Sequence, residues 1–157
     1  MARLLILIIL AACAAELPRP GDTADAVTAR FGHPSATYPD GAGQELEFAT
    51  GPMGQSTWMA HIGADGRLVN LEQVLTGPKF ATIRVDLADK AAVLRTLGRP
   101  SERSRVALGD YEVWSYRYKE NGVWNSMMHV HFDHAGIVRL MLNGPDPMYN
   151  EDKRGFR

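Results

Sequence analysis

The sequence predicts an α+β fold of two tandem units, each a helix followed by a three-stranded antiparallel sheet. The first observation is an internal repeat: residues 23–34 read TADAVTARFGHP, and residues 89–100 read DKAAVLRTLGRP. The second is that strand-like features follow in the same order in both halves. Runs of strands after a helix favour an α+β fold over a parallel sheet, in which helices and strands alternate.

The matched features place the two repeats along the chain. The pairs are Leu46 and Phe48 with Trp114 and Tyr116, Ala60-His61-Ile62 with Val130-His131-Phe132, and Gly66 with Gly136. We therefore expect a first repeat over residues 23–75 and a second over residues 76–145. Residues 146–157 are rich in turn formers and mixed charge, and they are expected to form an irregular tail.

Each predicted helix has a start signal and a stop signal. The candidate N-caps, whose short side chains can accept hydrogen bonds from free amides, are Asp22 or Thr23 in the first unit and Asp86 or Asp89 in the second. Gly32 and Gly98 suit the left-handed position just past a helix, and a proline follows each after two residues. Strands then follow, and Ala64-Asp65-Gly66 and His134-Ala135-Gly136 are the predicted hairpin turns.

The N-terminal segment has the pattern of a secretory signal. Arg3 precedes an unbroken apolar run, Leu4 to Leu10, and Ala11, Ala12 and Cys13 follow at once. The run is too short to span a bilayer, which needs about 18 or more apolar residues. It resembles the lipoprotein signal family, which implies a signal peptide over residues 1–12 and cleavage before Cys13.

The same resemblance implies that Cys13 carries acyl chains such as palmitate, with residues 13–22 as a tether. Cys13 is the only cysteine, so no structural disulfide can form. Ala14 stands where an aspartate favours retention in the inner membrane of lipoprotein families, so it implies export to the outer membrane of a Gram-negative bacterium. The alternative is an ordinary secreted protein, cut after Ala14 by a small-x-small rule.

A second resemblance rests on the second repeat. The motifs are Phe80 and Ile83 before the helix, Leu97-Gly98-x-Pro100 at its end, and Trp114-x-Tyr116 in the following strand. Together they resemble the SmpA/OmlA domain of the BamE family of outer-membrane lipoproteins, whose fold has two helices and a three-stranded antiparallel sheet. The chain departs from that family in carrying two copies, an arrangement similar to the β-lactamase inhibitor protein fold.

One motif could bind a metal. His129, His131, Asp133 and His134 spell H-x-H-x-D-H, the zinc signature of the metallo-β-lactamase fold. That fold needs further histidine ligands downstream, and no histidine follows His134. The repeat gives a simpler interpretation, a strand with a polar outer face, so no metal site is predicted. The alternative, a small metallohydrolase, would require a stoichiometric metal.

The two faces of the predicted second sheet have different expected roles. Trp114, Tyr116 and Tyr118 are expected to pack under the helices, as are Val130 and Phe132. The opposite face would carry Glu45, Glu47 and His61 in the first repeat and Arg117, His129 and His131 in the second. We expect Arg117, His129 and His131 to be exposed and to bind a partner, with Trp124, in a predicted loop, as a further anchor.

Composition limits the function further. The chain is 45% hydrophobic and 22% charged, with a formal net charge of −1, so no nucleic-acid surface is expected. No Ser-His-Asp constellation, phosphate loop or cofactor motif stands out. We expect a non-enzymatic outer-membrane lipoprotein that faces the periplasm. It would support outer-membrane protein assembly or envelope integrity through protein–protein contacts. The barrel-assembly machinery is one candidate partner. The alternative is a periplasmic binding or inhibitory module resembling β-lactamase inhibitor proteins.

The signal pattern generates a direct prediction. Replacing Cys13 by Ser should release the protein from membranes, because each buried methylene of an acyl chain contributes about 0.8 kcal/mol and several chains act together. Mass spectrometry of the mature N-terminus should show an acylated cysteine in the unmodified sequence and none in Cys13→Ser. A Cys13→Ser protein that stays in the outer-membrane fraction would contradict a lipid anchor.

Overall fold

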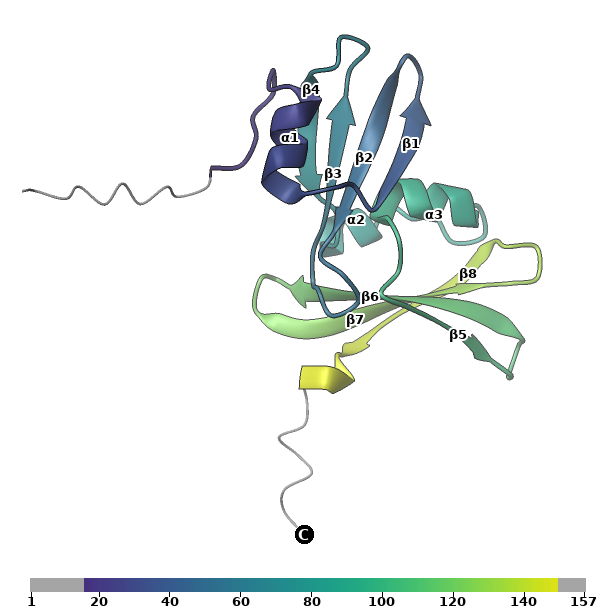
Figure 1. Ribbon diagram of the computed structural model, residues 1–157. Coiled ribbons are helices and arrows are strands. Elements are labelled where there is room, and N and C mark those ends of the chain that lie inside the picture. The colour runs from purple at the N-terminus through teal and green to yellow at the C-terminus, as the bar shows by residue number, and fades with distance from the viewer. Residues whose placement is uncertain (1–15, 150–157) are drawn as a thin grey trace, which may run out of the picture.

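The computed structural model describes residues 16–149, which form two α+β units in tandem (Figure 1). The N-terminal unit contains α1 (Ala24–Phe31), β1 (Ala36–Asp40), β2 (Gly43–Ala49), β3 (Thr57–Ile62) and β4 (Leu68–Gln73). The C-terminal unit contains α2 (Gly77–Phe80), α3 (Lys90–Leu97), β5 (Glu102–Val106), β6 (Tyr111–Glu120), β7 (Trp124–Phe132), β8 (Val138–Pro145) and the 3-10 helix η1 (Pro147–Tyr149).

Each sheet has four antiparallel strands in sequence order, so the prediction of three strands per unit is wrong. The strands that sequence analysis missed are β1 and β5, the first edge of each sheet. All five residues of β5 are exposed, so β5 lacks the half-buried alternation that marks a strand. β1 contains Pro39, and a proline counts against a strand assignment. The overall α+β class with tandem sheet units is confirmed.

The helices begin and end at the predicted signals. Thr23 and Asp89 are the N-caps, and their side chains accept hydrogen bonds from Ala26 N at 3.2 Å and Ala92 N at 2.7 Å. Gly32 and Gly98 are the C-caps of α1 and α3, with φ of +86° and +76°. Their ψ values, −163° and −164°, lie in a mirror-extended region that is almost exclusive to glycine, rather than in the predicted left-handed helical one.

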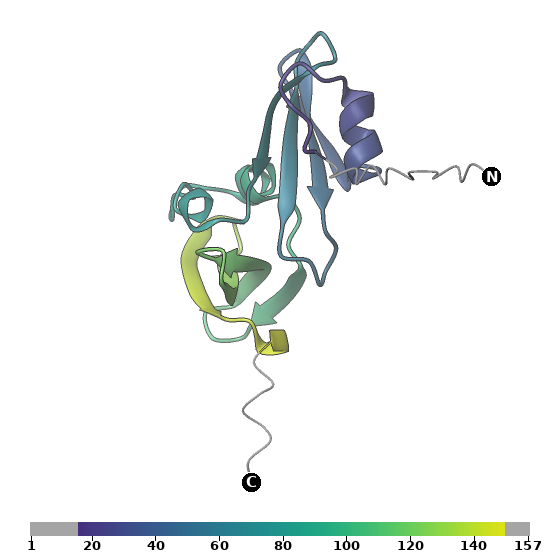
Figure 2. The ribbon, with the colours of Figure 1, turned by 90° about the vertical axis from the view of Figure 1, so that its left-hand side faces the viewer.

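Helices cover both faces of the N-terminal sheet. On one face α1 packs Val27 against Leu46, Phe48 and the other residues of a small core, and the ring of Phe31 stacks on Phe48 at 5.1 Å. On the other face lie α2 and α3, which sit between the two sheets (Figures 1 and 2). The second core is built around α2 and α3, and it extends into the N-terminal unit through Met59, Val74 and Leu75.

The prediction for the aromatic strand is confirmed. Trp114, Tyr116 and Tyr118 are at most 2% exposed, and Val130 and Phe132 are fully buried. We call this side of the C-terminal sheet its inner face and the opposite side its outer face. The predicted turn around Phe80 is also present: α2 begins at the N-cap Thr76, and the Phe80 ring lies edge-on to Tyr118 at 4.8 Å.

A buried carboxylate joins the two units. Glu47, on β2, is 0% exposed; it accepts hydrogen bonds from Tyr38 Oη at 2.7 Å and from Arg99 N, just past α3, at 3.1 Å. Tyr116 Oη donates to the carbonyl of Gly98 at 3.1 Å, so both sheets hold the same helix end. Burial, followed by the hydrogen bond to Glu47, raises the pKa of Tyr38 well above its usual value, so the phenol remains a donor.

Several expectations concern segments that lie partly or wholly outside residues 16–149. The signal peptide and Cys13 lie outside the described residues, as does the tail beyond Tyr149. Within residues 16–149, no helix is long and apolar enough to cross a membrane. The part of the tether that is described joins the fold, since Gly21 N donates to Leu68 O at 2.8 Å and Leu68 N donates to Asp22 O at 2.8 Å.

Gly98 and Gly32 form a matched pair for a stability test. A Cβ at Gly98 would lie 2.9 Å from Cδ of Glu47 and 3.0 Å from Cγ2 of Thr57, whereas a Cβ at Gly32 would meet nothing within 4 Å. Gly32→Ala should lower the free energy of unfolding by about 1–3 kcal/mol through backbone strain alone. Gly98→Ala should lower it by at least about 1 kcal/mol more, because the methyl group presses on the buried carboxylate. Equal losses in urea unfolding would contradict close packing at the junction.

Candidate functional site

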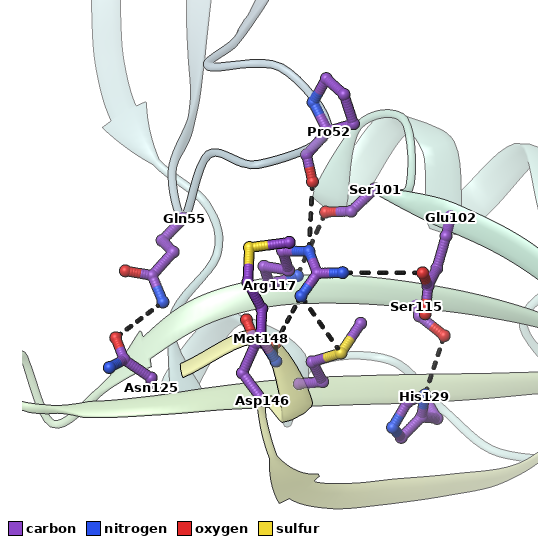
Figure 3. A network of polar contacts seen from close by, with 11 residues as sticks. Pro52, Gln55, Ser101, Glu102, Ser115, Arg117, Asn125, His129, Asp146 and Met148 are labelled. Carbon is purple, nitrogen blue, oxygen red and sulfur yellow. Dashed lines mark hydrogen bonds and ion pairs between the residues drawn. The ribbon is translucent and has the colours of Figure 1, made fainter. Parts of the chain in front are cut away.

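The outer face of the C-terminal sheet is covered by the chain itself at Arg117. Strand alternation does direct this side chain outward, but it is only 9% exposed (Figure 3). Its Nε donates to the carbonyl of Pro52 at 3.1 Å, Nη1 pairs with Asp146, and Nη2 lies 3.6 Å from Oε2 of Glu102. The expectation that Arg117 is an exposed partner-binding residue is therefore wrong.

Asp146 is the reason for this burial. Its side chain is 0% exposed; Oδ1 accepts from Met148 N at 3.0 Å in addition to pairing with Arg117. Its backbone N donates to the carbonyl of Asn125 at 3.0 Å, and the side chain of Gln55 donates to Asn125 Oδ1 at 2.9 Å (Figure 3). Together these bonds hold the β2–β3 loop and η1 against the outer face, so the predicted irregular tail starts with an ordered 3-10 turn.

The two outward histidines are also engaged within the fold. His129 Nδ1 lies 2.8 Å from Ser115 Oγ. His131 is 8% exposed, and its ring lies edge-on to Tyr111 at 5.9 Å. Burial, with a smaller effect of His129, lowers the pKa of His131, so the ring is neutral at pH 7. The outward direction of these side chains was predicted correctly, but the exposure of His131 was not.

Ser115 and His129 form a pair that sequence analysis missed. They are fourteen positions apart in sequence and become neighbours because β6 and β7 pair them directly. A serine hydrogen-bonded to a histidine is the arrangement that nucleophilic catalysis uses. Ser115, however, is 1% exposed, so no substrate can reach its hydroxyl in this conformation. The pair acts here as a cross-strand hydrogen bond.

The H-x-H-x-D-H motif does not converge on a point. The Asp133 carboxylate accepts from Ile137 N at 3.0 Å and pairs with Arg139 at 2.7 Å, and these two bonds lower its pKa, the backbone bond most. His134 instead lies 3.1 Å from Asp110. Within residues 16–149, no group of three or more His, Cys, Asp or Glu side chains could hold a metal ion.

Trp124 is the predicted partner residue that the structure leaves open. It is 67% exposed and Val123 is 65% exposed, at the tip of the β6–β7 hairpin. The register pairs Trp124 with Glu120 and Ser126 with Tyr118, which places all four on the inner face. The hairpin tip lies at the end of the C-terminal sheet, beyond the core that packs around Tyr118.

A groove opens beside Trp124, with a volume of about 580 Å³. Its lining, which we call the Trp124 groove, consists of Glu120, Val123, Trp124, Asn125, Ser126, Asn143, Gly144, Pro145 and Tyr149. Ser126 Oγ donates to Glu120 Oε2 at 2.8 Å, and Asn143 Nδ2 donates to Glu120 Oε1 at 3.0 Å. Tyr118 Oη donates in turn to Asn143 Oδ1 at 3.0 Å. Burial, and then the charge of Glu120, raises the pKa of Tyr118, so the phenol keeps its proton and this chain of bonds fixes the carboxylate.

No protein family model and no curated protein matches the chain. A solved structure does: the DUF4309 family protein YjgB from Bacillus subtilis subsp. subtilis str. 168, at 16% sequence identity and a TM-score of 0.31, over 77% of this chain and 76% of that chain. The similarity is too distant to carry a function from one protein to the other.

The expected resemblance to the SmpA/OmlA domain is wrong. No family model matches the chain, and each sheet has four strands instead of three. The motifs that suggested the family mark a helix end beside a buried aromatic strand. Gly98 and Tyr116 have these roles for local physical reasons, which any α+β protein can share.

The Arg117–Asp146 pair gives a prediction opposite to the one for an exposed residue. Arg117→Ala should lower the free energy of unfolding by about 3 kcal/mol or more, because it leaves the buried Asp146 charge uncompensated. Lys119→Ala, an exposed position two residues along β6, should change it by within about 0.5 kcal/mol. Urea unfolding of both variants makes the comparison, and indistinguishable midpoints would show that the pair does not hold η1 in place.

Proposed function

We propose that the protein is a lipid-anchored envelope protein that acts by binding another protein through the Trp124 groove. The observation that carries this proposal is the exposure of Trp124 and Val123 beside a groove of about 580 Å³. Tryptophan is the residue most enriched among binding hot spots, where a ring fills a pocket of the partner. An exposed aromatic with an apolar neighbour and a polar rim suits such a contact.

The hairpin that carries Trp124 is paired along its whole length and tied to the N-terminal unit. Strands β6 and β7 pair without interruption from the Glu112–Phe132 pair to the Glu120–Trp124 pair. Near the tip of the hairpin, the side chain of Asn125 is hydrogen-bonded to Gln55 of the N-terminal unit. A fixed surface loses little conformational entropy on binding, which favours specific association. The geometry therefore supports a preformed contact site rather than a flexible arm.

A binding role fits the chemistry of the described residues better than catalysis does. The hydrogen-bonded pair of Ser115 and His129 is closed to substrate. In the H-x-H-x-D-H motif, Asp133 pairs with Arg139 and His134 lies beside Asp110, so their side chains do not meet at one site. The anchor is proposed from Leu10-Ala11-Ala12-Cys13 and from Ala14, which favour the outer membrane and the periplasmic side.

Two classes of partner remain distinct proposals. An outer-membrane partner would support assembly of outer-membrane proteins or envelope integrity, as the lipid anchor favours. A soluble periplasmic enzyme would make the protein an inhibitory module, and the projecting hairpin, with Trp124 near its tip, favours this second candidate because such a tip can enter a cleft. The identity of the partner decides between them.

Photo-crosslinking in intact cells tests the proposed contact. A benzophenone amino acid placed at Val123 should crosslink to a defined partner protein, whereas the same group at Val69, which is 54% exposed on the N-terminal unit, should not. Trp124→Ala should weaken the crosslink about tenfold or more, as loss of a hot-spot residue does. Equal crosslinking from both positions, or none from Val123, would contradict the proposal.

A further inference from the structure

Among the described residues 16–149, Glu120 is the only charged side chain that lines the Trp124 groove. Its two carboxylate oxygens accept hydrogen bonds from neutral groups, Ser126 Oγ and Asn143 Nδ2. Among the ion pairs of residues 16–149, none includes Glu120. The groove therefore holds a carboxylate that two hydrogen bonds fix in position and that no cation of residues 16–149 neutralises.

Each oxygen of Glu120 keeps free capacity. A carboxylate offers about four lone-pair sites, and the two hydrogen bonds use one on each oxygen. The remaining sites suit a donor with two parallel N–H groups, which is the geometry of a guanidinium bound by a carboxylate. The side chain is half-buried, so a cation bound here would be screened less than one at a fully exposed acid.

Two aromatic residues complete the lining. Trp124 is 67% exposed and Tyr149 is 46% exposed, and both residues line the groove together with Glu120. Aromatic faces attract cations and lie well against the aliphatic stems of Lys and Arg. A carboxylate that shares one groove with two exposed aromatic residues is thus complementary to a positively charged, partly apolar side chain.

We propose that the Trp124 groove binds an arginine or lysine side chain of the partner protein, with Glu120 as the counter-ion and Trp124 as the ring that packs on its stem. This specifies the partner chemistry of the function proposed above and rests on it. A zwitterionic lipid headgroup suits the groove less well, because its phosphate would meet Glu120 and none of the described lining residues is a cation. An acidic segment is disfavoured for the same reason.

Short peptides test the proposal on the purified full chain. The probes are acetyl-Gly-Arg-Gly-amide, its Lys counterpart and a Gln counterpart, and the readout is the indole N–H resonance of Trp124, identified by its absence in Trp124→Phe. The Arg and Lys peptides should shift this resonance and the Gln peptide should not. Raising salt from about 0.05 to 0.5 M should weaken binding severalfold.

Variants separate charge from shape. Glu120→Gln keeps the size of the side chain and should weaken the Arg peptide about tenfold, while Glu16→Gln, an exposed acid outside the groove, should leave binding unchanged. Equal binding of Arg and Gln peptides, or full binding by Glu120→Gln, would overturn the proposal. So would a Trp124 shift caused by phosphatidylethanolamine vesicles and not by peptides.

The crosslinking result is independent of these measurements. If Val123 crosslinks to a partner but Glu120→Gln leaves that crosslink undiminished, the contact surface is correct and the cationic ligand is wrong. If the Arg peptide binds and Val123 yields no crosslink, the groove chemistry is correct and the protein-binding function is wrong.

Discussion

The arrangement of the two sheets depends on Glu47. Its carboxylate is fully buried and accepts hydrogen bonds from Tyr38 on its own sheet and from Arg99 N at the end of α3. A buried carboxylate without donors is very unfavourable, so the N-terminal sheet must meet the end of this helix. That requirement explains the glycine at position 98, and it fixes α3 between the sheets.

Glu47 and Ser115 occupy equivalent places in the two repeats. Each follows the first matched aromatic or apolar residue of its strand, and each lies opposite a residue of the next strand, Met59 or His129. Both are almost completely buried, because another segment of the chain packs on the face of the sheet that carries them. For the N-terminal sheet the cover is α3; for the C-terminal sheet it is the β2–β3 loop with η1. The repeats thus share a pattern but differ in which distant segment completes it.

The parts of the fold that sequence predicted are those with local causes. Caps at Thr23 and Asp89, the glycines that end the helices, and the inner-face aromatics all follow from spacing over a few residues.

Alternation also predicted the side of the sheet on which Arg117 and His131 lie, but it carries no information about which segments cover that side. Asp146 and Pro52 reach Arg117 from 29 and 65 positions away, and no local pattern shows this. Edge strand β5 was missed because all its residues are exposed, and β1 because it contains a proline. Trp124 was singled out because it is a large aromatic residue in a predicted loop. Glu120 was not, because its place in the groove depends on Asn143, which β8 brings near it.

The core that crosses the repeat boundary affects the order in which the chain can fold. Met59, Val74 and Leu75 are made with the first repeat, yet they are buried by α2, α3 and the aromatic strand of the second. While only the first repeat is free to fold, this apolar face and the Glu47 carboxylate stand open to water. A nascent chain in that state is prone to aggregate, so it needs either rapid completion or a chaperone that covers the unfinished face. The duplicated architecture is therefore one cooperative body, and its halves are not interchangeable modules.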